Sequence, residues 1–206
     1  FLYKDGKNAK RAVELAESMP SMAISRDFLL PVVTDGDRCY KETQSKVFNL
    51  VQFLEVAIGS MNVKLDSGEY AYTSEMRAAL RDKQIAFLHL MFENGDFGFF
   101  DTHLHYIHKN QAMYYAKVGD NEKAIEHLRH AAEHAIRFIK HMCKETHTSL
   151  LFRNMPAGSF ATTGTNNDAA ELLNSMRQPV FDNIRDTEAF KSIRNELSAY
   201  AGKWNV

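Results

Sequence analysis

Apolar residues recur every three or four positions along most of the chain, which is the spacing that places them on one face of an α-helix. This pattern predicts a long helix over about 38–59 and further helices over about 73–92, 97–118 and 122–142. Strand-like alternation is scarce, and the four prolines fall where helices would begin or end. The sequence therefore predicts an all-α fold.

The same spacing predicts helices over about 7–19, 168–176 and 188–200, and a short helix around Phe28. Residues 156–167 are rich in Gly, Thr, Ser and Asn, which is typical of a long loop. In the helix over 38–59, the apolar stripe that we expect to face inward consists of Val47, Leu50, Val51, Leu54 and Ile58.

A six-position pattern surrounds Gly119. Going backward from this glycine, Tyr115 comes four residues and Ala112 seven residues earlier; going forward, Ala124, Leu128 and Ala131 come five, nine and twelve residues later. Two antiparallel helices cross closely only if small side chains occupy their contact, and a glycine readily adopts the conformation that ends the first helix. The pattern resembles the tetratricopeptide repeat. That resemblance implies antiparallel helix pairs stacked in a right-handed array, an α-α superhelix.

A second resemblance covers most of the chain and rests on six short strings in a fixed order. It is to the C-terminal half of clostridial-type transcriptional regulators, in which a helix-turn-helix DNA-binding domain precedes a tetratricopeptide-like region. The resemblance implies that this chain is a regulatory or dimerising module and that DNA is bound only through an upstream domain. It carries no catalytic residue across. The strings are Ser18-Met19-Pro20-Ser21, Ser25-Arg26-Asp27, Phe92 to Phe99, His130 to Ala135, Thr148-Ser149-Leu150-Leu151 and Phe181 to Arg185.

Length and composition limit the remaining possibilities. With 206 residues, 45% of them apolar, the chain can bury one sizeable core, so we expect a single tetratricopeptide-like domain over 1–206. It starts at Phe1 inside an amphipathic stretch, which predicts the later part of a longer protein. A net charge of −1 without charge runs argues against nucleic acid or an anionic membrane as a direct partner. Two distant cysteines and nine methionines predict a cytoplasmic location.

Two histidine groups are candidates for metal chemistry or pH sensing. His130, Glu133 and His134 fit the H-x-x-E-H pattern, in which two histidines on one helix face share a metal and the glutamate acts as base. His103, His105 and His108 lie on the preceding helix and could meet the first group. The favoured interpretation is ordinary packing and hydrogen bonding. We therefore predict no catalytic residue, no metal ligand and no cofactor.

Binding follows more directly from the predicted architecture. The first helix of each stacked pair lines a concave face, so the outward positions before Gly119 are candidates for contact with a peptide, a small ligand or a protein partner. A plain solvated helix face is the equal alternative. The candidate residues are Tyr106, Lys109, Asn110, Met113 and Lys117.

These observations favour a non-catalytic, ligand- or partner-binding regulatory module of a transcriptional regulator. The alternatives are a protein-interaction scaffold of the tetratricopeptide type and, less favoured, a histidine-based metal-binding protein. No apolar stretch approaches the roughly 20 residues that a membrane span needs. A homodimer remains open.

Overall fold

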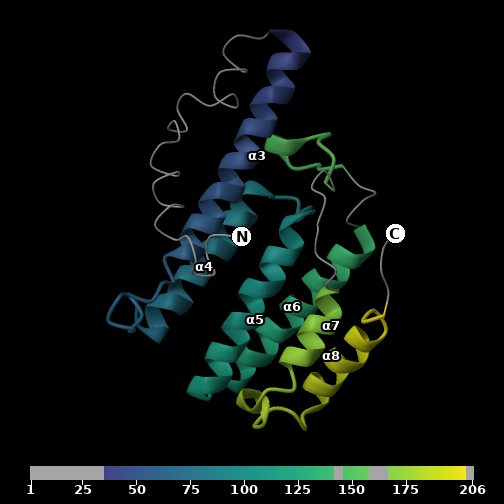
Figure 1. Ribbon diagram of the computed structural model, residues 1–206. Coiled ribbons are helices and arrows are strands. Elements are labelled where there is room, and N and C mark those ends of the chain that lie inside the picture. The colour runs from purple at the N-terminus through teal and green to yellow at the C-terminus, as the bar shows by residue number, and fades with distance from the viewer. Residues whose placement is uncertain (1–34, 142–145, 158–166, 203–206) are drawn as a thin grey trace, which may run out of the picture. The chain divides into compact units, whose positions relative to one another are not determined.

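The fold is all-α, as the hydrophobic pattern predicts. The computed structural model describes residues 35–141, 146–157 and 167–202, and these form six α-helices and two short 3₁₀ helices without a strand (Figure 1). The helices predicted over 7–19 and around Phe28, and most of the predicted loop over 156–167, lie outside the described residues.

The predicted helix ends lie within about three residues of the observed ones. Side chains cap four of the helices: Thr73, Asp120, Asn167 and Thr187 each accept a hydrogen bond from the backbone N–H three residues later. The 3₁₀ helices are too short to leave a periodic signal, and the sequence did not predict them. The helices are α3 (Gly36–Ser60), α4 (Ser74–Met91), α5 (Phe100–Val118), α6 (Asn121–His141), η2 (Leu150–Phe152), α7 (Asp168–Ser175), η3 (Pro179–Phe181) and α8 (Glu188–Ser198).

Contacts along the backbone divide the chain into two compact units, residues 1–50 and 51–206. The second unit contains the end of α3 and all of α4 to α8. The single domain expected over 1–206 stays a prediction.

Helices α5 and α6 form the most extensive helix–helix contact of the second unit (Figure 1). Gly119 ends α5 with a left-handed φ of +85°, a conformation that a side chain would disfavour. Ala112, Ala124 and Ala131 are fully buried. The close packing of small residues around Gly119 is therefore confirmed, whereas the stacking of such pairs into a superhelix remains a prediction.

Apolar side chains from α5 to α8 form one core, in which Leu128, Leu172 and Phe190 are among the fully buried residues. Buried aromatic rings at the α4–α5 turn form a further cluster, which joins Phe92 to Phe152 of η2. The aromatic run after Gly95 therefore contributes mainly to the interior, where Phe97 and Phe100 are buried.

The side chain of Asp96 fastens residues 146–157 to the α4–α5 turn. Its carboxylate accepts hydrogen bonds from the backbone N–H groups and the hydroxyls of both Thr148 and Ser149. Burial opposes ionisation, but the hydrogen bonds from Ser149 and Thr148 outweigh it and lower the pKa of Asp96. The η2 segment is thus held by an ionised carboxylate.

The inward stripe of α3 differs from the prediction at two positions. Phe48, which the predicted stripe leaves out, is 1% exposed. Leu54 is 47% exposed, and Glu55 occupies the buried position instead. Glu55 can be buried because its carboxylate accepts hydrogen bonds from Gln84 Nε2 at 3.0 Å and from His103 Nδ1 at 2.6 Å. Gly59 allows this approach, since an added Cβ would lie only 3.0 Å from Gln84 Nε2.

Candidate functional site

A pocket of about 300 Å³ lies between the end of α3, helix α4 and the first half of α5. We call it the arginine groove, because two arginines of α4 line it. Both polar and apolar side chains line it, so it can offer hydrogen bonds as well as apolar contact. The lining residues are Glu55, Ile58, Gly59, Asn62, Arg77, Leu80, Arg81, Gln84, Thr102, His103, Tyr106, Ile107 and Asn110.

Arg77 is positioned before any ligand arrives. Its guanidinium lies 4.0 Å from the centre of the Tyr70 ring, and its Nη2 donates to Ser74 Oγ at 3.2 Å. Its Nε is buried and has no hydrogen-bond partner. A buried donor without an acceptor is uncommon in folded proteins, so Arg77 Nε retains unused hydrogen-bonding capacity.

Arg81 follows one helical turn later and lines the same groove. Its Nη1 donates to Gln111 Oε1 at 2.8 Å. Burial, and secondly the charge of Arg77, lower the pKa of Arg81. Within the described residues neither guanidinium forms an ion pair. The two like charges therefore repel each other, and the charge of the nearby Asp82 offsets this effect on Arg81 only in part.

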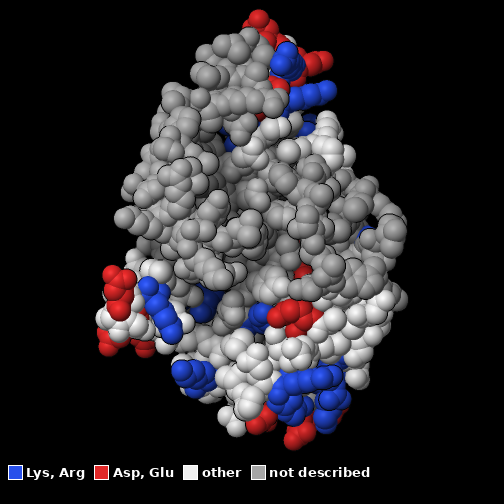
Figure 2. All heavy atoms as spheres, viewed as in Figure 1, with Lys and Arg blue, Asp and Glu red and all other residues white. Residues whose placement is uncertain are grey.

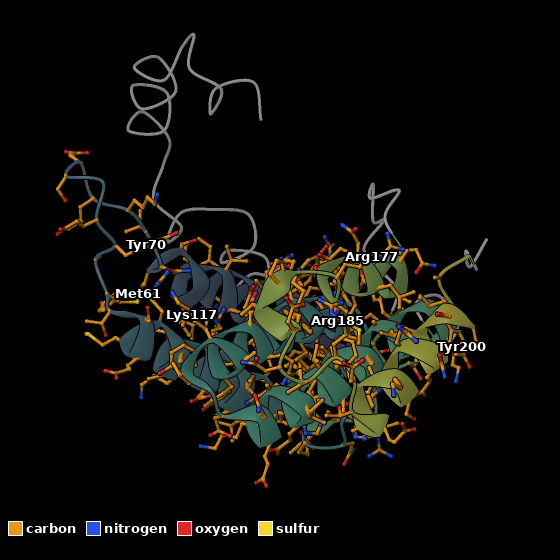
Figure 3. All side chains as sticks on the ribbon, turned by 90° about the horizontal axis from the view of Figure 1, so that it is seen from below. Met61, Tyr70, Lys117, Arg177, Arg185 and Tyr200 are labelled. Carbon is orange, nitrogen blue, oxygen red and sulfur yellow. The ribbon has the colours of Figure 1, made fainter. Side chains whose placement is uncertain are left out.

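The five binding residues expected from the sequence do not share one surface. Tyr106 and Asn110 line the arginine groove. Met113 is partly buried against the core, and Lys117 is exposed at the C-terminal end of α5 (Figure 3). Lys109 is only 8% exposed, so the expectation that it faces outward is wrong. The binding role of these residues stays a prediction.

Lys109 is buried because α7 covers its side of α5. Its Nζ lies 2.6 Å from Glu171 Oε1, and the other carboxylate oxygen of Glu171 accepts a hydrogen bond from His105 Nε2 at 3.0 Å. Burial opposes ionisation, but the bonds to His105 and Lys109 outweigh it and lower the pKa of Glu171 to about 2. This network joins α5 to α7.

A larger pocket of about 920 Å³ lies on another face, between α4 and α6. We call it the histidine pocket. Its centre is His108 of α5, whose ring centroid lies 5.1–5.5 Å from the centroids of His127, His130 and His134. His89 of α4 lines the same pocket. The two histidine groups noted in the sequence therefore meet, although His108 is the one histidine of the α5 group that takes part.

Hydrogen bonds direct the other histidines elsewhere. His103 donates to Glu55 and His105 contacts Glu171, so neither enters the histidine pocket. His130 lies 3.2 Å from Glu133, whereas the buried His134 lies 2.7 Å from Asp101. The H-x-x-E-H histidines thus engage separate carboxylates. In residues 35–141, 146–157 and 167–202, no three His, Cys, Asp or Glu side chains are arranged to hold a metal ion.

The pair His108–His127 restricts protonation. Their Nδ1 atoms lie 2.9 Å apart, so one ring must donate while the other accepts, and both cannot be cationic while this bond exists. Burial, followed by the charges of His134, His127, His130 and His89, lowers the pKa of His108 to about 2. His108 therefore stays neutral at every physiological pH.

This neutrality predicts a pH-dependent stability. Below pH 6.5 the unfolded chain binds a proton at His108 that the folded chain excludes, so acid favours unfolding and the stability falls as the pH drops from 6.5 toward 2. At about 1.4 kcal/mol per pH unit, the loss at pH 5 is about 2 kcal/mol. We expect His108→Gln, which keeps a hydrogen-bonding group but does not titrate, to remove about this much of the difference in urea-unfolding free energy between pH 7.5 and pH 5. An unchanged difference would contradict the assignment.

Sequence reasoning missed Arg77, Arg81 and Glu55. The two arginines are four residues apart and so share one face of α4, which was the only signal that could have found them. On the described part of the surface in Figure 2, acidic and basic side chains lie interspersed rather than gathered by sign.

The sequence matches no family model, and a search finds no match among curated proteins or solved structures. Of the helices in the described ranges, none combines the length and apolar character that crossing a bilayer would require. The function must therefore be argued from the site itself.

Proposed function

We propose that this chain is a non-catalytic regulatory module that binds a small ligand, a peptide or a partner segment in the arginine groove. The observation that carries the proposal is the convergence of four side chains in one pocket. Tyr106 and Asn110, which the sequence singles out for binding, line it together with Arg77 and Arg81. Ile58, Leu80 and Ile107 supply apolar contact.

Binding fits the groove better than catalysis does. His103 is oriented by Glu55 as a general base would be, with 2.6 Å between His103 Nδ1 and Glu55 Oε2. Within the described residues, however, no hydroxyl or thiol forms a hydrogen bond with the other ring nitrogen of His103. An activated nucleophile requires such a contact. The pair therefore serves to hold α3 against α5.

The regulatory role rests on the resemblance to clostridial-type regulators. A bound ligand would change the pose of an upstream DNA-binding domain only if it binds two conformations with different affinities. We expect the full-length protein to bind a promoter fragment and residues 1–206 alone not to bind it. DNA binding by residues 1–206 alone would count against this role.

A protein-interaction scaffold is the second candidate function. It is favoured by exposed apolar side chains on the α3–α4 connection, where Met61 is 43%, Leu65 53% and Tyr70 45% exposed (Figure 3). Exposed apolar side chains that lie close together mark protein interfaces. A partner that still binds after Arg77→Gln but is lost after Leu65→Ser would support this function over ligand binding.

The groove itself is tested by ligand screening. We expect compounds or peptides that raise the thermal midpoint of the wild type to bind Asn110→Ala at least about tenfold more weakly, since a buried polar contact contributes about 1.4 kcal/mol or more. Asn121→Ala is the matched control, because Asn121 is an exposed asparagine of α6 outside the groove. Ligands that bind wild type and Asn110→Ala equally well would place the site elsewhere.

A further inference from the structure

We infer that the ligand of the arginine groove carries a planar, singly charged carboxylate that binds between the guanidinium groups of Arg77 and Arg81. This inference rests on the proposed function and names the chemistry that the groove selects. It follows from the contacts that these arginines make, from those they lack and from the charge of the groove.

One hydrogen-bond donor of Arg77 has no acceptor among the described residues. Arg77 Nε is buried and has no hydrogen-bond partner, while stacking on Tyr70 and the bond to Ser74 fix the plane of its guanidinium. A fixed guanidinium presents its N–H groups as a flat fork, which matches the two oxygens of a carboxylate. The geometry of Arg77 is thus prepared for a planar anion.

The positive charges of Arg77 and Arg81 repel each other. Arg77 and Arg81 lie four residues apart on α4, and both line the same half-buried pocket. Like charges at this spacing destabilise a helix, and the low polarizability of a pocket strengthens the effect. Glu55, the acidic residue of the groove lining, is already bound to Gln84 and His103. A ligand anion would relieve the repulsion.

The net charge of the groove lining limits the charge of the ligand. In the groove lining, Arg77 and Arg81 contribute two positive charges and Glu55 contributes one negative charge. Asp82, which lies outside the lining, also attracts Arg81. The excess of positive charge is therefore small and suits a singly charged carboxylate. A phosphate monoester, with a charge of roughly −1.5 to −2, would exceed it and would face Glu55 in the same pocket. The groove therefore favours a carboxylate over a phosphate.

The remaining lining explains how the rest of the ligand would be held. Asn110 and Asn62 offer amide donors and acceptors, and Tyr106 offers a ring and a hydroxyl. Ile107 and Leu80 give the apolar contact. A small organic acid or the free C-terminus of a peptide would supply the same carboxylate, and the two sources are separated by experiment.

The test observes the arginine side chains directly. In the ¹⁵N-labelled chain, the Nε–H resonances of Arg77 and Arg81 are followed by NMR during titration with propanoate, propanamide, N-acetyl-triglycine, its C-terminal amide and inorganic phosphate. We expect one or both acids to shift the Arg77 resonance saturably, and the matching amides to leave it unchanged. Phosphate should bind at least about threefold more weakly.

Arg77→Gln should weaken carboxylate binding, read from the Arg81 resonance, at least about tenfold, because a charge-assisted hydrogen bond is lost. Arg129→Gln, which removes an exposed arginine of α6, is the matched control and should bind as the wild type does. Both variants are first checked for an unchanged circular dichroism spectrum and melting curve. If Arg77→Gln alone is unfolded, Arg77→Lys replaces it, and the same loss is expected because Lys lacks the planar fork.

Three results would overturn the inference: equal shifts with acids and amides, tighter binding of phosphate, or unchanged affinity in the Arg77 variant. If, in that case, neutral ligands from the screen still bind Asn110→Ala more weakly than the wild type, the proposed binding function stands, and the inference of a carboxylate ligand is wrong. If no ligand depends on Asn110 either, both fail.

Discussion

Lys109→Met is expected to lower the free energy of unfolding by about 3 kcal/mol and to leave ligand binding in the arginine groove unchanged. The variant leaves the Glu171 carboxylate without its lysine partner. This carboxylate is 26% exposed and keeps only His105 and Ser175 as hydrogen-bond partners. Removing one member of a largely buried ion pair costs about 3–5 kcal/mol, and the partial exposure of Glu171 places the effect at the lower end. Urea unfolding measures it.

The free energy of unfolding at low pH provides a second test of the same Lys109–Glu171–His105 network. The pKa of Glu171 is lowered to about 2, so its contribution is complete above its usual value near 4.5 and is lost as the pH falls from 4.5 toward 2. Lys109→Met should flatten this loss. The double variant Lys109→Met/Glu171→Met should recover part of the stability, because neither charge is then left unpaired. If Lys109→Met weakens a groove ligand instead and leaves stability intact, the sequence-based assignment of Lys109 to binding is right.

Phe92→Ala is expected to lower the free energy of unfolding by about 3–5 kcal/mol, the usual cost of deleting a fully buried aromatic side chain. Its ring stacks on Phe152 with 4.7 Å between centroids and contacts Phe100 at 5.2 Å. The cavity would therefore weaken the attachment of η2 as well as the α4–α5 turn. Hydrogen exchange at residues 146–157 should accelerate together with the loss of global stability.

Phe53→Ala is the control for this variant, because Phe53 is 59% exposed and its removal should change the stability by no more than about 0.5 kcal/mol. Equal effects of the two substitutions would contradict the assignment of Phe92 to the core. If exchange stays slow in residues 146–157, then Asp96 rather than Phe92 holds that segment.

The spacing of apolar residues predicted the helices well, because many residues together define the buried face of a helix. A single buried polar side chain leaves no such trace. Leu54 fits the apolar stripe of α3, yet Glu55 lies inside because Gln84 and His103 satisfy its carboxylate. The spacing of apolar residues could not reveal partners that come from two other helices.

The candidate site was predicted in part for the same reason. Tyr106 and Asn110 line the arginine groove as a concave helix face would suggest, but Lys109, on the same stretch of α5, turns to Glu171 of α7. No pattern in the sequence indicated that α7 would cover this part of α5. Arg77 and Arg81 become noteworthy only when their contacts are known, because a pair of arginines on a helix is usually solvated.

The histidines show that a match to a sequence motif does not determine which side chains are in contact. His130, Glu133 and His134 match a catalytic pattern in sequence, but His134 turns inward to Asp101, while His130 pairs with Glu133 near the surface. Helical spacing places both histidines on one face without fixing the rotamer of either. The meeting of His108 with α6 follows from the close α5–α6 packing that the alanine pattern around Gly119 predicts.

The account depends most on the arginine groove being the place where a ligand or partner binds. The most direct measurement is a map of backbone amide chemical shifts in the ¹⁵N-labelled chain on saturation with the best ligand from the thermal screen. The account predicts that the largest shifts fall in residues 55–62, 77–84 and 102–110, which line the groove. Largest shifts around His89 and residues 126–140, which line the histidine pocket, would contradict it.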